Sequence, residues 1–414
     1  MTSRERVLKT LNHEEPDRVP LDMGSTIVTG IAAVALDRLR EHLGLPYRPV
    51  KVYDVYQMLG EVEMDVIDRL GIDCVAVNPP ILRMGLKGEG WKPWTLMDGT
   101  EVLMPGQFDI EVTPEGDWLL HQEGDPNQAA VARMPKDGFY FDTIGFGDWH
   151  PEWMPPPLDE MRAQIEGAIV SDAELEHMAA EAKRLHGETD KAVVLNGFPY
   201  LGVGYVGSLP DFMALLASDR EYVKELFALA SARALRNLAR LWDAMGDTVD
   251  VVAVSGLDFG TQRSEWFSAE VFREVYVPSF REQFQWIAAH TTWKSFEHSC
   301  GSVARLVGLM SDAGLDALNP VQTSAAGMDP QWLKETYGGR LTYWGGGVET
   351  QSTLPFGTPD EVSREVAERL KVFGPGGGFV FCPIHNIQAD TPPENIVAAY
   401  ETARELGTYP IHNR

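Results

Sequence analysis

The sequence predicts an α/β protein built as a (β/α)8 TIM barrel, and three features of its patterning support this fold class. Short, continuously apolar runs alternate with longer stretches in which apolar residues recur every three or four positions. Each run ends in glycine, proline, asparagine or a charged residue, as a buried strand does where it meets a loop. There are eight such runs, the number of strands in a closed parallel barrel. A doubly wound open sheet is the alternative, because it also alternates buried parallel strands with helices.

The predicted strands are spread along the whole chain, after a short helix expected over residues 3–11. The first is RVPLDMG at residues 18–24, which has a proline near its start and a glycine at its end. The other runs are CVAVNPP from Cys74, VVLNGFPY from Val193, VVAVSGLDFG from Val251, TTWKSFEHSC ending at Cys300, ALNPVQ from Ala317, LTYWGGGVE from Leu341 and GGFVFCPIHN from Gly377. Fully buried strands separated by crossover helices indicate a parallel sheet.

Helices are expected between these strands, because the apolar residues there follow helical spacing. The predicted helices cover residues 31–43, 55–70, 172–185, 220–245, 269–290, 302–313, 359–373 and 393–406. We therefore expect residues 1–414 to form a single barrel domain.

Residues 85–157 interrupt this alternation and are interpreted as an insertion after the second strand. They hold five of the 11 tryptophans and nine of the 27 prolines. The stretches MDGTEVLMPG and TPEGDWLLHQEGD are typical of β-hairpins with Asp-Gly and Glu-Gly turns. We expect a hairpin-rich lid over the carboxyl ends of the barrel strands. A surface hairpin that only shields the barrel is the alternative.

Charge and composition exclude several classes of function. The chain has 35 Lys and Arg against 61 Asp and Glu, a net charge of −26. Such an acidic protein repels phosphate backbones and anionic membranes, so neither nucleic acid nor membrane is an expected partner. No run of about 18 apolar residues and no signal-peptide core is present, and the three cysteines make no disulfide framework. We expect a cytoplasmic protein.

A metal site is predicted where two predicted strands end. His298 and Cys300 are two residues apart at the end of the fifth strand, so an extended backbone points both side chains to one side. Cys382 lies near the end of the eighth strand and would reach the same barrel mouth. One histidine and two cysteines, with a fourth position open, form a typical catalytic zinc site. The alternative for Cys382 is that it fills space in an apolar strand, as buried cysteines usually do.

Other polar side chains at the strand ends are candidates for substrate binding, because the βα loops of a barrel build that face. They are Asp22, Tyr200, Asp258, Asn319, Gln322, Glu349 and His385. Asp258 and Glu349 could equally support a metal ligand or be plain polar groups of the barrel end. His385 has no paired context in the sequence, so solvent or local hydrogen bonding is its default environment.

Five segments carry a resemblance to a known family. They are SRERVLKTLNHEEPDRVPLDMG, FEHSCGSVARLV, LNPVQ, YWGGGVETQ and FVFCPIHNIQADTPPENI. Together they resemble the uroporphyrinogen decarboxylase superfamily, and within it the corrinoid-dependent methyltransferase branch, which includes the methylcobamide:coenzyme M methyltransferases. The zinc motif of that branch, His-x-Cys followed much later by Cys, maps onto His298, Cys300 and Cys382.

The resemblance implies a zinc-dependent enzyme that moves a methyl group between a corrinoid and a small molecule, either an O-methyl aromatic compound or a thiol such as coenzyme M. No Asp-x-His-x-x-Gly corrinoid motif is present, so the corrinoid is expected on a separate small protein. A porphyrinogen decarboxylase is the alternative. That enzyme binds its carboxylates with an arginine-rich segment after its first strand, whereas this chain has LDMGSTIVTG there.

Overall fold

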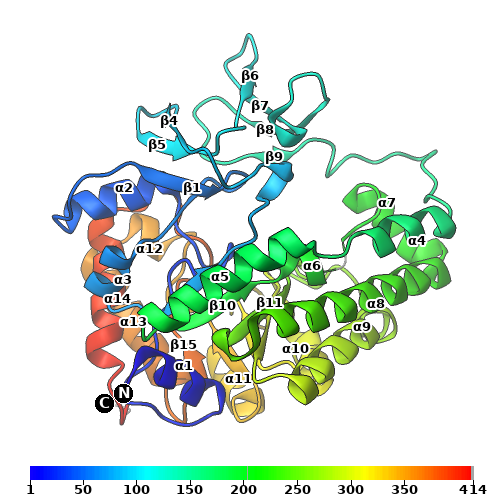
Figure 1. Ribbon diagram of the computed structural model, residues 1–414. Helices are drawn as coiled ribbons and strands as arrows, with labels where there is room; N and C mark the ends of the chain where they lie inside the picture. The colour runs from blue at the N-terminus through cyan, green and yellow to red at the C-terminus, as the bar shows by residue number, and fades with distance from the viewer. Residues whose placement is uncertain (203, 412–414) are drawn as a thin grey trace.

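The computed structural model describes residues 1–202 and 204–411, and its centre is a curled sheet of seven parallel strands (Figure 1). The strands lie side by side in chain order. They are β3 (Cys74–Val77), β10 (Ala192–Asn196), β11 (Val251–Ser255), β12 (Lys294–His298), β13 (Ala317–Asn319), β14 (Thr342–Trp344) and β15 (Phe379–Val380). Seven of the eight predicted strands are therefore present, and the TIM-barrel-like α/β fold class is confirmed.

The first predicted strand joins the two edges of this sheet, although it forms only an isolated bridge. Leu21 pairs in parallel with Phe381, which follows β15. On the other side, the backbone N–H of Asp73 donates to the carbonyl of Leu21 at 2.8 Å, immediately before β3. Hydrogen bonds on both sides of Leu21 thus close the curled sheet into a barrel.

Eleven helices of eight residues or more lie along the described part of the chain, and most begin at the predicted positions. They are α1 (Ser3–Leu11), α2 (Ala33–His42), α4 (Leu158–Gly167), α5 (Asp172–Glu188), α7 (Leu209–Ser218), α8 (Arg220–Met245), α9 (Ala269–His290), α10 (Ala304–Ala313), α11 (Pro330–Tyr337), α13 (Pro359–Phe373) and α14 (Pro393–Leu406), with shorter α3 (Met64–Leu70), α6 (Phe198–Leu201) and α12 (Thr353–Phe356) among them. Capping boxes at Thr2, Ser171 and Thr358 fix the starts of α1, α5 and α13.

The eleven helices of eight residues or more can be compared with the predicted helices. Eight of them match predicted helices, and α4, α7 and α11 were not predicted.

The helix predicted over residues 55–70 is wrong for its first nine residues. Residues 50–60 form an antiparallel pair, β1 (Val50–Asp54) with β2 (Leu59–Gly60), and only α3 at the end is helical. The carboxylate of Asp54 accepts the backbone N–H groups of Tyr56 and Gln57, and Met58 has a φ of 54°. A turn of this kind prevents a helix from forming here. The apolar residues that fit helical spacing belong to the β1–β2 pair instead.

The insertion contains six strands, and both predicted hairpins are present. The strands are β4 (Lys92–Thr95), β5 (Glu101–Met104), β6 (Ile110–Val112), β7 (Trp118–His121), β8 (Ala130–Met134) and β9 (Asp142–Thr143). The hairpin β4–β5 turns at Asp98-Gly99, and β6–β7 turns at Glu115-Gly116. β5 also pairs in parallel with β1, so the insertion shares a sheet with residues that precede β3.

Figure 1 shows the insertion above one end of the barrel, whereas α1 lies below the opposite end. Val7 and Leu11 of α1 pack into the barrel interior together with Phe296, Trp344 and Val380, all of them buried. The amino end of the barrel is therefore filled by apolar side chains, and the carboxyl end is left for a site. None of the described helices combines the length and apolarity that a membrane crossing requires.

We expect that removing the carboxylate of Asp73 will destabilise the barrel strongly. Asp73 is fully buried, receives the N–H of Leu21, and pairs with Arg6 of α1 and with Arg18, each at 2.7 Å. Asp73→Ala removes the carboxylate that two guanidinium groups share, and Arg6 keeps only its pair with the half-exposed Asp17. Breaking a buried pair in this way costs about 3–5 kcal/mol. The measurement is urea unfolding of the variant and the parent protein.

Asp312→Ala is the matched control, since it breaks the exposed pair with Arg340. It should change the free energy of unfolding by no more than about 1 kcal/mol. Equal losses in the two variants would mean that Asp73 does not hold the edges of the sheet together.

Candidate metal centre at the mouth of the barrel

His298 is the last residue of β12, and its ring is oriented by a chain of hydrogen bonds across three strands. The Nδ2 of Asn319 donates to the carbonyl of Trp344 at 2.8 Å, and the Oδ1 of Asn319 lies 2.6 Å from the Nδ1 of His298. A carbonyl only accepts, so the amide nitrogen must face Trp344 and the amide oxygen must face the ring. Nδ1 therefore carries a proton, which leaves Nε2 to face the barrel mouth as the ligand atom.

Cys300 lies beside this nitrogen, as the spacing of the two residues predicts. Its Sγ is 3.3 Å from the Nε2 of His298. The backbone N–H of Cys300 donates to the Oδ1 of Asp258 at 2.8 Å, and the same oxygen is 3.5 Å from Nε2. Asp258 follows β11, so three neighbouring strand ends contribute to the cluster.

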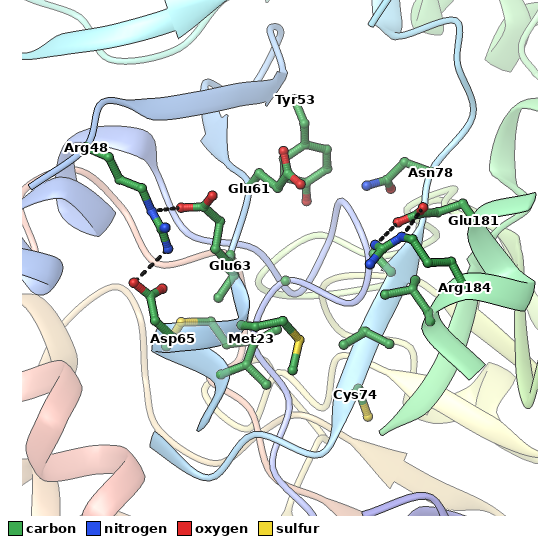
Figure 2. A pocket seen from close by; sticks show the side chains of 17 residues that line it. Met23, Arg48, Tyr53, Glu61, Glu63, Asp65, Cys74, Asn78, Glu181 and Arg184 are labelled. Carbon is green, nitrogen blue, oxygen red and sulfur yellow. Dashed lines mark hydrogen bonds and ion pairs between the residues drawn. The ribbon is translucent and has the colours of Figure 1, made fainter. Parts of the chain in front are cut away.

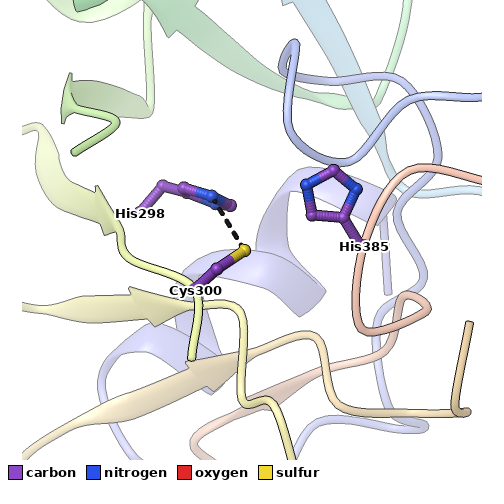
Figure 3. A group of neighbouring side chains, drawn as sticks. All are labelled: His298, Cys300 and His385. Atoms are coloured by element: carbon purple, nitrogen blue, oxygen red, sulfur yellow. Dashed lines mark hydrogen bonds between the residues drawn. The ribbon is translucent and has the colours of Figure 1, made fainter. Parts of the chain in front are cut away.

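His385 completes the cluster from the other side of the mouth. Ligand atoms of His298, Cys300 and His385 all lie within 4.8 Å of one another, and Figure 3 shows the three side chains around a common point. The loop that carries His385 is fixed by Asn386, whose Oδ1 accepts the N–H of Gly30 at 2.6 Å and whose Nδ2 donates to Ile27 and Gln57. The position of His385 is thus held by buried hydrogen bonds.

The charges in this cluster shift the pKa values of its members. Burial opposes a charge on His298, but Cys300 and Asp258 raise its pKa well above the ordinary value. Burial works against the thiolate of Cys300, yet the neighbouring His298 lowers the pKa of that thiol. Burial also opposes the Asp258 carboxylate, and its contact with His298 lowers that pKa nonetheless. These directions favour an imidazolium–thiolate pair, and a bound cation would displace the shared proton.

Cys382 is not part of this cluster, so the predicted ligand set needs a correction. The Cys382 side chain is fully buried among Phe296, Trp344 and Val380 inside the barrel. Burial raises the pKa of its thiol well above the usual range. The reason is strand alternation: Cys382 shares the inner face with Val380, and the chain reaches the mouth only in the following loop, at His385. Alternation along the strand from Val380 could have predicted from the sequence that the Cys382 side chain points inward.

The cluster opens into a cavity of about 590 Å³ between the barrel and the insertion. Cys300, Gln322 and His385 line it from the barrel, and Tyr140 and Asp142 line it from the insertion. The insertion therefore forms part of the wall of the cavity. Its role as a lid stays a prediction.

The structure separates the predicted substrate-binding residues into two groups. Asp258, Asn319, Gln322 and His385 lie at the cluster or line its cavity. The other three, described next, do not.

Asp22, Tyr200 and Glu349 make contacts elsewhere. The Asp22 carboxylate is buried and accepts the indole N–H of Trp344 at 2.8 Å. The Tyr200 hydroxyl donates to Glu174 at 3.0 Å on the outside of the barrel. Glu349 lines a separate open groove beside α13. Being at a strand end was therefore not sufficient to place a side chain at the mouth.

A second cavity, of about 440 Å³, lies between β1, β3 and α5 (Figure 2). Its two arginines are already paired with acids: Arg48 with Glu63 and Asp65, and Arg184 with Glu181. Cys74 lies in its wall, but burial raises the pKa of that thiol well above the usual range. No member of the His298 cluster lines this cavity, so the two sites are separate.

Comparison with known proteins assigns the family. Residues 147–406 match the family model described as uroporphyrinogen decarboxylase (URO-D). This match covers more than half of the chain, including β10–β15 and all three residues of the cluster. The chain belongs to the URO-D family. The resemblance found in the sequence is thereby confirmed for the family.

Two relatives illustrate the range of the URO-D fold. A protein from Psychromonas ingrahamii (strain DSM 17664 / CCUG 51855 / 37), named uroporphyrinogen decarboxylase, is 24% identical over 285 residues, which are 66% of this chain and 77% of that protein. A solved structure, named methyltransferase from Methanosarcina mazei, matches with a TM-score of 0.55 and 16% identity, over 98% of this chain and 99% of that chain. The second match extends the common fold over nearly the whole chain.

The three cysteines should differ in reactivity. Cys300 is partly exposed with a lowered thiol pKa, whereas Cys74 and Cys382 are buried with raised ones. Because the thiolate is the reactive form, we expect iodoacetamide to alkylate Cys300 at least about tenfold faster than the other two in chelator-treated protein. Peptide mass spectrometry over time measures the three rates. Cys300→Ser should abolish the fast reaction, and rapid alkylation of Cys382 would contradict its interior position.

Proposed function

We propose that this URO-D family protein is a zinc-dependent methyltransferase, which moves a methyl group between a corrinoid carried by a partner protein and a small molecule. The observation that carries the proposal is the convergence of ligand atoms of His298, Cys300 and His385 within 4.8 Å of one another beside a cavity. His385 replaces Cys382 in the ligand set that the sequence suggested.

The donor set fits zinc. Two imidazoles and one thiolate are ligands that zinc accepts, and three protein ligands leave a position for a substrate atom. The lowered pKa of Cys300 also favours the thiolate that a metal requires. When bound, zinc would act as a Lewis acid that keeps a substrate thiol ionised or polarises the heteroatom of a methyl donor.

The chain's own residues orient and enclose the reactants. Asn319 fixes the ring of His298, and Asp258 holds the backbone of Cys300. The cavity walls from the barrel and the insertion position the small molecule and exclude water around it. Methyl transfer is an in-line displacement, so accurate positioning supplies much of the rate acceleration.

A separate corrinoid protein is the proposed partner. The sequence has no Asp-x-His-x-x-Gly motif for holding a corrinoid of its own. The likeness of fold to the Methanosarcina methyltransferase supports the proposal of methyl transfer. An acidic surface accepts such a partner if the partner's contact face is basic or apolar.

A porphyrinogen decarboxylase is the second candidate, favoured by the family name and by the Psychromonas relative. Its substrate carries many carboxylates, which require cationic partners in the site. Among the described residues that line the 590 Å³ cavity, none is an arginine or a lysine. The composition of the cavity therefore favours methyl transfer over decarboxylation.

We expect the purified protein to contain about one zinc ion per chain. Cys300→Ala and His385→Ala each remove a ligand and should lower the zinc content to a small fraction of the parent value. Cys382→Ala is the matched control, because that thiol is buried inside the barrel and should leave the zinc content unchanged. Metal analysis measures all four proteins, with circular dichroism to check folding. Loss of zinc in Cys300→Ala and Cys382→Ala, but not in His385→Ala, would contradict the role of His385 and favour Cys382 as the third ligand.

The activity test uses free methylcobalamin as the methyl donor and a small thiol as the acceptor. The change in cobalamin absorbance measures the rate of methyl transfer. We expect transfer that chelators abolish and that Cys300→Ala reduces at least about a hundredfold, since this variant lacks a ligand of the metal that acts as the Lewis acid. Chelator-resistant release of carbon dioxide from uroporphyrinogen, without methyl transfer, would instead establish the decarboxylase.

A further inference from the structure

Side-chain amides are the most frequent polar side chains in the wall of the cavity beside the metal centre. Six of its lining residues are carboxamides, and they come from the barrel loops and from the turn after β1. They are Gln57, Gln262, Gln322, Gln351, Asn386 and Gln388. Amides donate and accept hydrogen bonds without a net charge, so this wall suits polar but uncharged groups.

Several of these amides have one end fixed and the other end free for a ligand. The Oε1 of Gln322 accepts the N–H of Gly301 at 2.7 Å, which leaves its Nε2 as a donor. The Nε2 of Gln388 donates to the carbonyl of Asn386 at 3.0 Å, which leaves its Oε1 as an acceptor. Gln262 and Gln351 bond to each other at 3.1 Å. Donors and acceptors are therefore both available around the cavity.

Away from the metal ligands, the only charged side chain in the described lining of the cavity is a carboxylate. Asp142 lines it, and Asp258 contacts Cys300 at its edge. No arginine or lysine belongs to the described lining: Arg83 lies over the ring of Tyr56, and Arg263 neighbours Gln262 in the chain, but neither lines the cavity. The first turn of α10 is also occupied, because Glu265 accepts the N–H of Arg305 at 3.0 Å. Away from the metal ligands, an anionic group would therefore find no lysine or arginine in the described lining and no free N–H at Arg305.

We propose that the small molecule of the methyl transfer carries no negative charge: it is an uncharged thiol or methyl ether with hydrogen-bonding groups. This inference rests on the proposed function and adds its substrate class. A sulfonate or carboxylate would lose its hydration among amide dipoles and face Asp142, a like charge. An uncharged hydroxyl group can hydrogen-bond to these donors and acceptors without repulsion by Asp142 and without the loss of ionic hydration.

With a thiol acceptor, the reaction balances as follows. A sulfur–carbon bond forms, the cobalt–carbon bond of the methylcorrinoid breaks, and its electron pair stays on cobalt. The proton of the thiol leaves to solvent. The substituent at the other end of the thiol takes no part in bond making. The effect of its charge on kcat/KM therefore measures the preference of the cavity alone.

Two thiols of similar size test the proposal: 2-mercaptoethanol, which is neutral, and 2-mercaptoethanesulfonate, which is anionic. With methylcobalamin as the donor and about 0.15 M salt, we expect kcat/KM for the neutral thiol to be at least about tenfold higher. Gln351→Lys should shift this ratio toward the sulfonate at least about fivefold, whereas Gln351→Met, which adds no charge, should keep the neutral preference.

Equal or better use of the sulfonate by the parent protein would overturn the inference and leave the proposed function standing. If neither thiol is methylated, 2-methoxyphenol and 2-methoxybenzoate are compared as donors to Co(I) cobalamin, with the same preference for the uncharged compound expected. Failure of all four compounds would overturn the proposed function itself, together with the inference that rests on it.

Discussion

Closure of the parallel sheet at Leu21 is the constraint on which the candidate centre depends. On one side of Leu21, the backbone of Phe381 hydrogen-bonds to Pro20 and Asp22, and on the other side the N–H of Asp73 donates to the carbonyl of Leu21. In a sheet curled into a barrel, the end of β12 and the loop after β15 face one another across the same opening, and these carry Cys300 and His385. Asp73 with Arg6 and Arg18 ties this closure to the amino-terminal helix, so groups at one end of the barrel support a site at the other.

Inside the mouth, neutral hydrogen bonds position the charged groups. Asn319 orients His298 through a backbone carbonyl, and Asn386 fixes the loop of His385 through backbone groups of residues 27–30. Amides suit this role because each offers a donor and an acceptor in fixed geometry without adding charge. The same residue type then continues into the cavity wall, where Gln322 and Gln388 have free polar ends.

Much of the fold could be predicted from the sequence, because buried strands and amphipathic helices leave local patterns. The helices α8, α9, α13 and α14 have the predicted bounds. The region of Met58 was mispredicted, since a turn formed by the Asp54 side chain outweighs helical spacing.

The candidate site was predicted only in part, because it depends on which way side chains point after a strand has ended. His298 and Cys300 were placed correctly by alternation on one strand. Cys382 was selected for its place near the end of the eighth strand and for the zinc motif of the resembled family, yet alternation from Val380 directs it into the core. His385 gave no local signal, since its neighbours in the cluster come from a distant strand.

The parallel pairing of β5 with β1 has a consequence for exchanging parts between relatives. A loop that merely extends from a barrel can be grafted or trimmed at its two anchor points. Here the insertion contributes β5 to a sheet that also contains β1, which precedes β3 in the chain. The structural unit therefore includes residues outside the range 85–157. A chimera that swaps residues 85–157 alone would cut through that sheet, and a workable transplant has to carry residues 50–60 with it.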